Sequence, residues 1–133
     1  MDGCLLSFDF NNKVLQCASA NNPIWIYRKS IHDIEEKKPD KQSIGKSNDP
    51  KPFTTHCFEL SDGDIIYVFT DGFADQFGGP GGKKYKYKQM EQVLMANRGK
   101  SFEEQKNNLR KSFDDWKGNL EQVDDVCVIG VKI

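Results

Sequence analysis

An apolar run at residues 65–69, followed two positions later by Asp71 and Gly72, restricts most strongly how this chain can fold. Five consecutive apolar residues, rich in β-branched and aromatic types, predict a buried strand. Gly72 has no side chain, so its backbone can turn sharply or approach an ion closely. A second apolar run, residues 126–131, follows Asp124-Asp125. We therefore expect two strands to bring acidic side chains to one edge of a sheet.

Two interpretations of these acidic residues remain open on pattern alone. Carboxylates in a partly buried site repel one another unless a cation neutralises them, and Mg²⁺ or Mn²⁺ often uses only one or two carboxylates. This interpretation makes Asp71, Gly72 and Asp124 a metal site. However, Asp-Gly after a strand is also an ordinary turn signal, and Asp-Asp before a strand is often solvated.

The composition is that of a single soluble globular domain. Of the 133 residues, 37% are hydrophobic and 29% are charged, which is enough apolar material for a core. The formal net charge of -1 gives no electrostatic argument for binding nucleic acid or an anionic membrane. No apolar stretch approaches the roughly 20 residues of a membrane span, and no signal peptide opens the chain. We expect a cytoplasmic protein, or a cytoplasmic domain of a larger signalling protein.

The cysteines and histidines do not form a recognisable site. The four cysteines are widely spaced and lie in strand-like surroundings: Cys4, Cys17, Cys57 and Cys127. Without a Cys-x-x-Cys pair, neither a zinc site nor a disulfide framework is expected, and the thiols are predicted to be small buried residues in a reducing compartment. His32 and His56 stand alone and are expected to be structural or exposed.

The first half of the chain predicts an antiparallel meander with one long interruption. The expected strands, each bounded by turn residues, are residues 4–10, 14–20, 24–27 and 57–60. Residues 28–55 are rich in Lys, Asp, Glu, Pro, Ser and Asn, and are predicted to be a long polar insertion or loop, largely solvated. Residues 61–64, Ser-Asp-Gly-Asp, predict a turn into the strand at 65–69.

A glycine-rich stretch with several lysines follows the Asp-Gly corner. Residues 73–77 predict a short helical turn, and residues 78–84 contain four glycines. Their spacing does not match a P-loop, so we expect a flexible loop rather than a phosphate cradle. The nearby lysines are Lys83, Lys84, Lys86 and Lys88. They either attract phosphate near the site or belong to a solvated surface.

Two helices are predicted before the last strand. Tyr87, Met90, Val93 and Leu94 recur at helical spacing within residues 85–97. Ser101 and Glu104 form a capping box, and Gly118 ends the second helix. The apolar stripe of that helix is Phe102, Leu109, Phe113 and Trp116. Strands first, then helices and a final strand, indicate an α+β domain with a mostly antiparallel sheet.

Several segments, taken in order, resemble one family. They are Ala18-Ser19-Ala20-Asn21-Asn22-Pro23, Ile44-Gly45, Leu60-Ser61-Asp62-Gly63-Asp64, Phe69-Thr70-Asp71-Gly72-Phe73-Ala74-Asp75, Trp116 and Asp124-Asp125-Val126. This succession resembles the PP2C-type (PPM) serine phosphatases of bacteria, in the branch named for the stage II sporulation protein E and the sigma-factor regulatory phosphatases. The resemblance covers nearly the whole chain.

The resemblance implies a fold and a chemistry. The family folds as a β-sandwich flanked by helices, in α-β-β-α layers, and hydrolyses phosphoserine or phosphothreonine in proteins. It uses two Mn²⁺ or Mg²⁺ ions and a metal-activated water, so no side chain acts as a nucleophile. By position, Asp71 with Gly72 and Asp124 match metal-binding positions of the family. Asp125 is expected to cap or orient the loop that carries Asp124.

The chain also departs from the family pattern. It lacks the family's acidic residue near the first strands and the Asp-x-x-Gly-His-Gly motif, and Asp2 matches no metal position. Residues 1–133 are therefore expected to be the C-terminal portion of one incomplete phosphatase domain, excised from a protein with an N-terminal sensor region. Such a piece is expected to bind Mn²⁺ weakly and to show little activity. Exposed sheet edges would favour its self-association.

The expected partner is a phosphorylated protein, and family habit suggests an anti-sigma factor antagonist. No nucleic acid and no membrane contact by this segment are expected. The competing hypothesis is a catalytically silent phosphatase-like domain that binds a partner without turning it over. The two differ in whether the missing motif lies immediately upstream in the parent protein.

Overall fold

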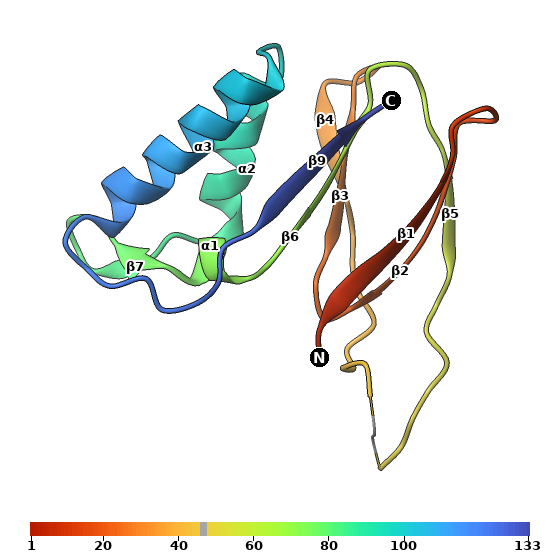
Figure 1. Ribbon diagram of the computed structural model, residues 1–133, viewed down its shortest axis with the longest axis horizontal. Helices are drawn as coiled ribbons and strands as arrows, with labels where there is room; N and C mark the ends of the chain where they lie inside the picture. The colour runs from red at the N-terminus through yellow and green to blue at the C-terminus, as the bar shows by residue number, and fades with distance from the viewer. Residues whose placement is uncertain (46–47) are drawn as a thin grey trace. The chain divides into compact units, whose positions relative to one another are not determined.

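A computed structural model describes residues 1–45 and 48–133 (Figure 1). The contacts of the chain divide it into two compact units. The first consists of residues 1–69 and 128–133, and the second of residues 70–127. Within the described residues, no helix has the length and apolar character needed to cross a membrane.

Two antiparallel sheets make up the first unit. One has the strand order β1-β2-β5 and the other β4-β3-β6-β9. The strands are β1 (Gly3–Asp9), β2 (Val14–Ala20), β3 (Ile24–Arg28), β4 (Asp33–Lys37), β5 (His56–Glu59), β6 (Ile65–Phe69) and β9 (Val128–Lys132). Each strand expected from the sequence is confirmed, with limits that shift by at most two residues. The predicted α+β class with mostly antiparallel pairing is confirmed as well.

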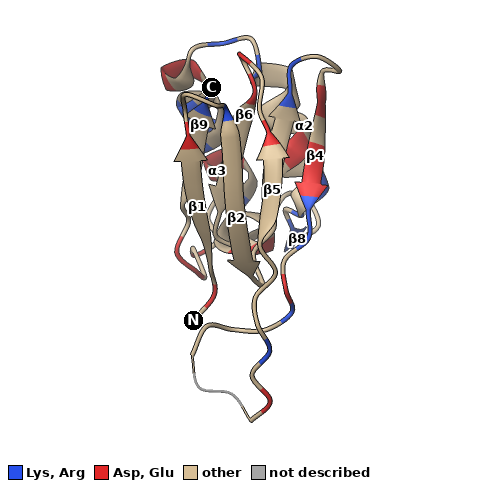
Figure 2. Ribbon diagram, turned by 90° about the vertical axis from the view of Figure 1, so that its right-hand side faces the viewer, with Lys and Arg blue, Asp and Glu red and all other residues tan. Residues whose placement is uncertain are grey.

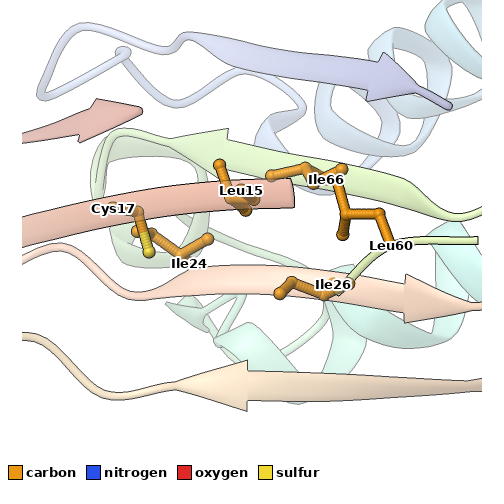
Figure 3. Close-up of a cluster of buried hydrophobic side chains, with 6 residues drawn as sticks. All are labelled: Leu15, Cys17, Ile24, Ile26, Leu60 and Ile66. Atoms are coloured by element: carbon orange, nitrogen blue, oxygen red, sulfur yellow. The ribbon is translucent and has the colours of Figure 1, made fainter. Parts of the chain in front are cut away.

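The core of this unit lies between the two sheets (Figure 3). The strands β2 and β3 each contribute two residues that are two positions apart, because such side chains share a face, and β6 and the residue after β5 contribute one each. These residues are Leu15, Cys17, Ile24, Ile26, Leu60 and Ile66. All are less than 7% exposed. The long apolar side chains of the sequence thus hold the two sheets together.

The prediction of a long polar loop at residues 28–55 is wrong at β4. This strand pairs with β3 along its whole length. Polar bonds support the pairing, since Trp25 Nε1 donates to Glu36 at 3.1 Å and Arg28 Nε donates to Glu35 at 3.0 Å. With only one apolar residue, the strand shows no hydrophobic alternation. Positions 46 and 47 of the predicted loop lie outside the described residues.

The cysteines only partly follow the expectation of burial. Cys17 is buried and Cys4 is half-buried, whereas Cys57 and Cys127 are exposed. On β5 the side chain that packs on the core is Phe58, so its neighbour Cys57 points to the other face. Burial raises the pKa of the Cys4 thiol to about 11. All four thiols are free.

The second unit contains three helices and a small hairpin. Its elements are α1 (Gly72–Asp75), β7 (Phe77–Gly78), β8 (Lys83–Lys84), α2 (Tyr87–Asn97) and α3 (Phe102–Lys117). The capping box of Ser101 and Glu104 is present, and Gly118 is the C-cap of α3, as predicted. The expected apolar stripe is wrong at its first position, because Phe102 is 43% exposed.

The glycine-rich stretch is a packed hairpin and not merely a flexible loop. Gly79 N donates to Trp116 O at 2.8 Å. A side chain at Gly78 would overlap the backbone carbonyl of Trp116, and one at Gly79 would lie 2.6 Å from the indole ring. These glycines are therefore required for the close approach of the hairpin to α3.

A buried carboxylate organises the turn before β6. Asp64 is 1% exposed and accepts hydrogen bonds from Ser61 N at 3.0 Å, Lys29 N at 3.0 Å and Arg28 Nη1 at 3.1 Å. The turn is thereby tied to the residues that follow β3. Sequence reasoning identified this turn but not the burial of its last residue.

The Asp64→Ala substitution should lower the free energy of unfolding by about 3 kcal/mol, because it leaves the partly buried Arg28 guanidinium and two backbone N–H groups without their acceptor. Urea unfolding of the chain measures this loss. Asp62→Ala is the matched control: Asp62 lies in the same turn but is exposed, with an ion pair to Lys13, so its removal should leave the midpoint nearly unchanged. Equal midpoints for the two variants would contradict the assignment.

The capping box should make the stability of α3 depend on pH. Hydrogen bonds from the Ser101 hydroxyl and backbone N–H lower the pKa of Glu104 below its ordinary value of 4.5. The stabilisation by the Glu104 carboxylate is therefore complete above its ordinary pKa of 4.5, and it is lost as the pH falls through the lowered pKa of the folded state. Between about pH 5 and about pH 3, Glu104→Gln should lose less stability than the parent. Thermal unfolding followed by circular dichroism tests this, with Glu103→Gln as the control for charge alone.

Candidate metal centre

The segment that carries Asp71 is held firmly within the second unit. Asp71 is the N-cap of α1, with φ of -71° and ψ of -18°, and its side chain makes no capping bond. Its carbonyl accepts a hydrogen bond from Asp75 N at 2.9 Å. The next side chain, Phe73, is buried with its ring centroid 5.1 Å from those of Tyr85 and Phe113. The Asp71 side chain itself is exposed and available to a ligand.

The loop that carries Asp124 and Asp125 is ordered by its own hydrogen bonds. Asp125 N donates to Asp124 Oδ1 at 2.7 Å, and Gln122 Nε2 donates to Asp124 O at 2.9 Å. The first bond restricts the rotation of the Asp124 carboxylate. Both acidic side chains are exposed.

The backbone of Gly72 lies directly against this loop. A Cβ built on Gly72 would be 3.0 Å from Asp125 C and 3.3 Å from Asp124 C, and would overlap Asp125 O. The structure thus brings together the Asp71-Gly72 corner and the backbone carbonyls of Asp124 and Asp125. The glycine was expected to permit a sharp turn or the approach of an ion. Here it makes room for the backbone that carries the second pair of carboxylates.

These residues fit a hard divalent cation. Asp71 and Asp124 offer exposed carboxylate oxygens, which are ligands that Mg²⁺ and Mn²⁺ accept, and Gly72 leaves space for the close approach of their backbones. No group of three or more His, Cys, Asp or Glu residues that could hold a metal ion is found in residues 1–45 and 48–133. Two carboxylates alone supply only part of a coordination shell.

Two residues that sequence reasoning missed contact the loop. Thr70 Oγ1 donates to Asp125 O at 2.8 Å, and Gln76 Nε2 donates to Glu121 O at 2.9 Å. In the sequence each of them is a polar residue between a phenylalanine and an aspartate, a pattern that does not indicate a role. Of the four lysines near the corner, Lys84 pairs with Asp75 at 3.0 Å, and both side chains are nearly half exposed.

A sequence profile of one family, described as stage II sporulation protein E (SpoIIE), matches residues 1–133. The chain belongs to the SpoIIE family. No curated protein sequence matches it significantly. The match spans both units of the SpoIIE-family chain, including the corner and the loop described above.

Solved structures show the same fold. The SiaA PP2C domain of Pseudomonas aeruginosa has a TM-score of 0.87 and 22% identity, over 99% of this chain and 51% of that one. The SpoIIE phosphatase domain of Bacillus subtilis, presoaked with Mn, has a TM-score of 0.72 and 16% identity, over 100% of this chain and 56% of that one. The RsbU and RsbW domains of a Mycobacterium tuberculosis protein have a TM-score of 0.71 and 17% identity, over 98% and 35%. This SpoIIE-family chain thus has the PP2C fold and spans about half the length of the first two structures.

Replacing Gly72 with alanine should disrupt the loop. Alanine is otherwise a better helix residue than glycine, so a loss of stability would come from the overlap with Asp125. We expect a lower thermal midpoint and shifted amide resonances at Asp124 and Asp125. Gly99→Ala is the control, because a Cβ at Gly99 meets no atom within 4 Å. The assignment fails if Gly72→Ala is as stable as Gly99→Ala.

Proposed function

We propose that this chain forms the C-terminal half of a metal-dependent protein serine/threonine phosphatase domain. The family and the fold are those of PP2C-type phosphatase domains of the SpoIIE, RsbU and SiaA kind. The observation that supports the metal site is the approach of Gly72 to the backbone carbonyls of Asp124 and Asp125. It brings together two acidic segments that are far apart in the sequence.

In this proposal Asp71 and Asp124 hold Mn²⁺ or Mg²⁺ through their carboxylates, and the backbone at Gly72 permits their close approach. Asp125 orients the loop, since its N–H fixes the Asp124 carboxylate. The bound ions supply Lewis acidity and a water of lowered pKa, which is the chemistry needed to hydrolyse a phosphate monoester without a protein nucleophile. The remaining ligands come from the other half of the domain.

The proposed substrate is a protein phosphorylated on serine or threonine, with an anti-sigma factor antagonist as the first candidate. The proposed location is the cytoplasm, within a protein that also carries a sensor region. Assaying the full-length protein against a panel of phosphorylated antagonist-type domains tests the substrate. If no member of the panel is dephosphorylated, this substrate class is excluded. The phosphatase proposal itself is then tested by the Mn²⁺ binding and aryl phosphate hydrolysis measured in the next experiment.

Removing either carboxylate should abolish metal binding and turnover. In the full-length protein we expect Asp71→Asn and Asp124→Asn each to weaken Mn²⁺ binding by more than about 100-fold, since loss of even an outer-shell partner costs about 10- to 100-fold. Calorimetric titration and hydrolysis of an aryl phosphate measure the two effects. Asp114→Asn removes the same charge from the exposed face of α3 and serves as the control.

The isolated 133-residue chain should bind Mn²⁺ weakly and hydrolyse little. Robust turnover by the chain alone would contradict the proposal that it supplies only part of the site. A full-length protein that binds a phosphorylated partner without hydrolysing it would instead support a silent binding domain.

A further inference from the structure

We infer that Thr70 and Gln76 are positioning residues for the proposed metal site. They hold residues 121–127, which carry Asp124 and Asp125, against the segment that carries Asp71. The spacing of the two carboxylates would then be set before an ion binds. This inference rests on the proposed function, because it assigns a role at the same site.

Thr70 holds the end of the loop through a single hydroxyl group. Its Oγ1 donates to Asp125 O at 2.8 Å and accepts from Cys127 N at 3.0 Å. Its backbone N–H also donates to Cys127 O at 3.0 Å. A hydroxyl can donate once and accept at the same time, so one side chain fixes the two peptide groups that follow Asp125. Thr70 directly precedes Asp71 in the sequence, so the hydroxyl that holds the loop and the carboxylate of the candidate site lie on one short backbone segment.

Gln76 holds the beginning of the loop. Its side chain is 0% exposed, and its Nε2 donates to Glu121 O at 2.9 Å and to Phe77 O at 3.0 Å. Its Oε1 is the one buried side-chain polar atom without a partner among the described residues. Burying an acceptor without a hydrogen bond is unfavourable, and an apolar side chain would avoid this. The contribution of the Gln76 amide is its hydrogen bond to the carbonyl of Glu121, which lies three residues before Asp124.

The loop is therefore fixed at three points. Gln76 binds its beginning, Gly72 lies against the backbone carbonyls of Asp124 and Asp125, and Thr70 binds its end. All three contacts come from residues 70–76, the segment that also carries Asp71. Groups that orient metal ligands without touching the ion commonly change metal affinity by about 10- to 100-fold when they are removed. We expect an effect of this size here.

The first test compares Thr70→Val with Thr70→Ser in the full-length protein. Valine keeps the branched shape but lacks the hydroxyl, whereas serine keeps the hydroxyl. Thr70→Val should weaken Mn²⁺ binding, measured by calorimetric titration, by about 10- to 100-fold, and Thr70→Ser should bind Mn²⁺ nearly as tightly as the parent. With excess Mn²⁺ the maximal rate of aryl phosphate hydrolysis by Thr70→Val should recover, because the ligands themselves remain.

The second test uses two buried glutamines. Gln105 is 5% exposed and donates its Nε2 to Lys100 O at 3.0 Å, in a segment without a candidate site residue. Gln76→Glu and Gln105→Glu remove the same donor, and circular dichroism compares their stabilities. Only Gln76→Glu should weaken Mn²⁺ binding. If Gln76→Glu or Gln105→Glu does not fold, the comparison of Thr70→Val with Thr70→Ser tests the positioning role by itself.

The outcomes separate this inference from the proposed function. If Asp71→Asn abolishes Mn²⁺ binding while Thr70→Val binds as the parent does, the positioning role is wrong and the metal site stands. Equal losses in Gln76→Glu and Gln105→Glu would also overturn the role of Gln76. If Asp71→Asn leaves Mn²⁺ binding unchanged, the proposed metal site itself fails, and the positioning role fails with it.

Discussion

The candidate site depends on one backbone approach, that of Gly72 to the backbone carbonyls of Asp124 and Asp125. No side chain larger than hydrogen fits there, because a Cβ would overlap the Asp125 carbonyl. The approach links two acidic segments that the chain separates by a hairpin and two helices. Around it, the buried ring of Phe73 and the hydrogen bonds of Thr70 and Gln76 keep both segments in place. The metal binding proposed for this chain therefore depends on a backbone contact at Gly72, a residue that has no side chain to bind an ion.

Most of the fold was predictable because its buried strands are apolar segments that can be recognised in the sequence. Residues such as Leu15, Ile26 and Ile66 supply the core between the sheets, and the apolar segments that contain them are visible in the sequence. The strand β4 was not predictable in this way. Its stability comes from pairing with β3 and from polar bonds such as that between Trp25 and Glu36, which depend on a partner strand and leave no periodic signal.

The candidate site was predictable only in part, and for the same reason. Asp71 and Asp124 could be placed near each other, since each stands beside an apolar strand and both match a family position. Whether they form a metal site or two turns could not be decided from those residues alone. The roles of Thr70 and Gln76 could not be predicted at all, because their hydrogen bonds reach across 55 and 45 positions of the sequence.

The two sheets of the first unit also present unequal edges. The edge strand β4 reads Asp-Ile-Glu-Glu-Lys, and Figure 2 shows its concentration of acidic residues. Such charge discourages the addition of another strand. The edge strand β1 reads Gly-Cys-Leu-Leu-Ser-Phe-Asp, and Leu5 on it is 76% exposed. An added strand would therefore meet three acidic side chains at β4, whereas β1 carries a single acidic residue, Asp9, so charge protects the edge at β1 less than the edge at β4.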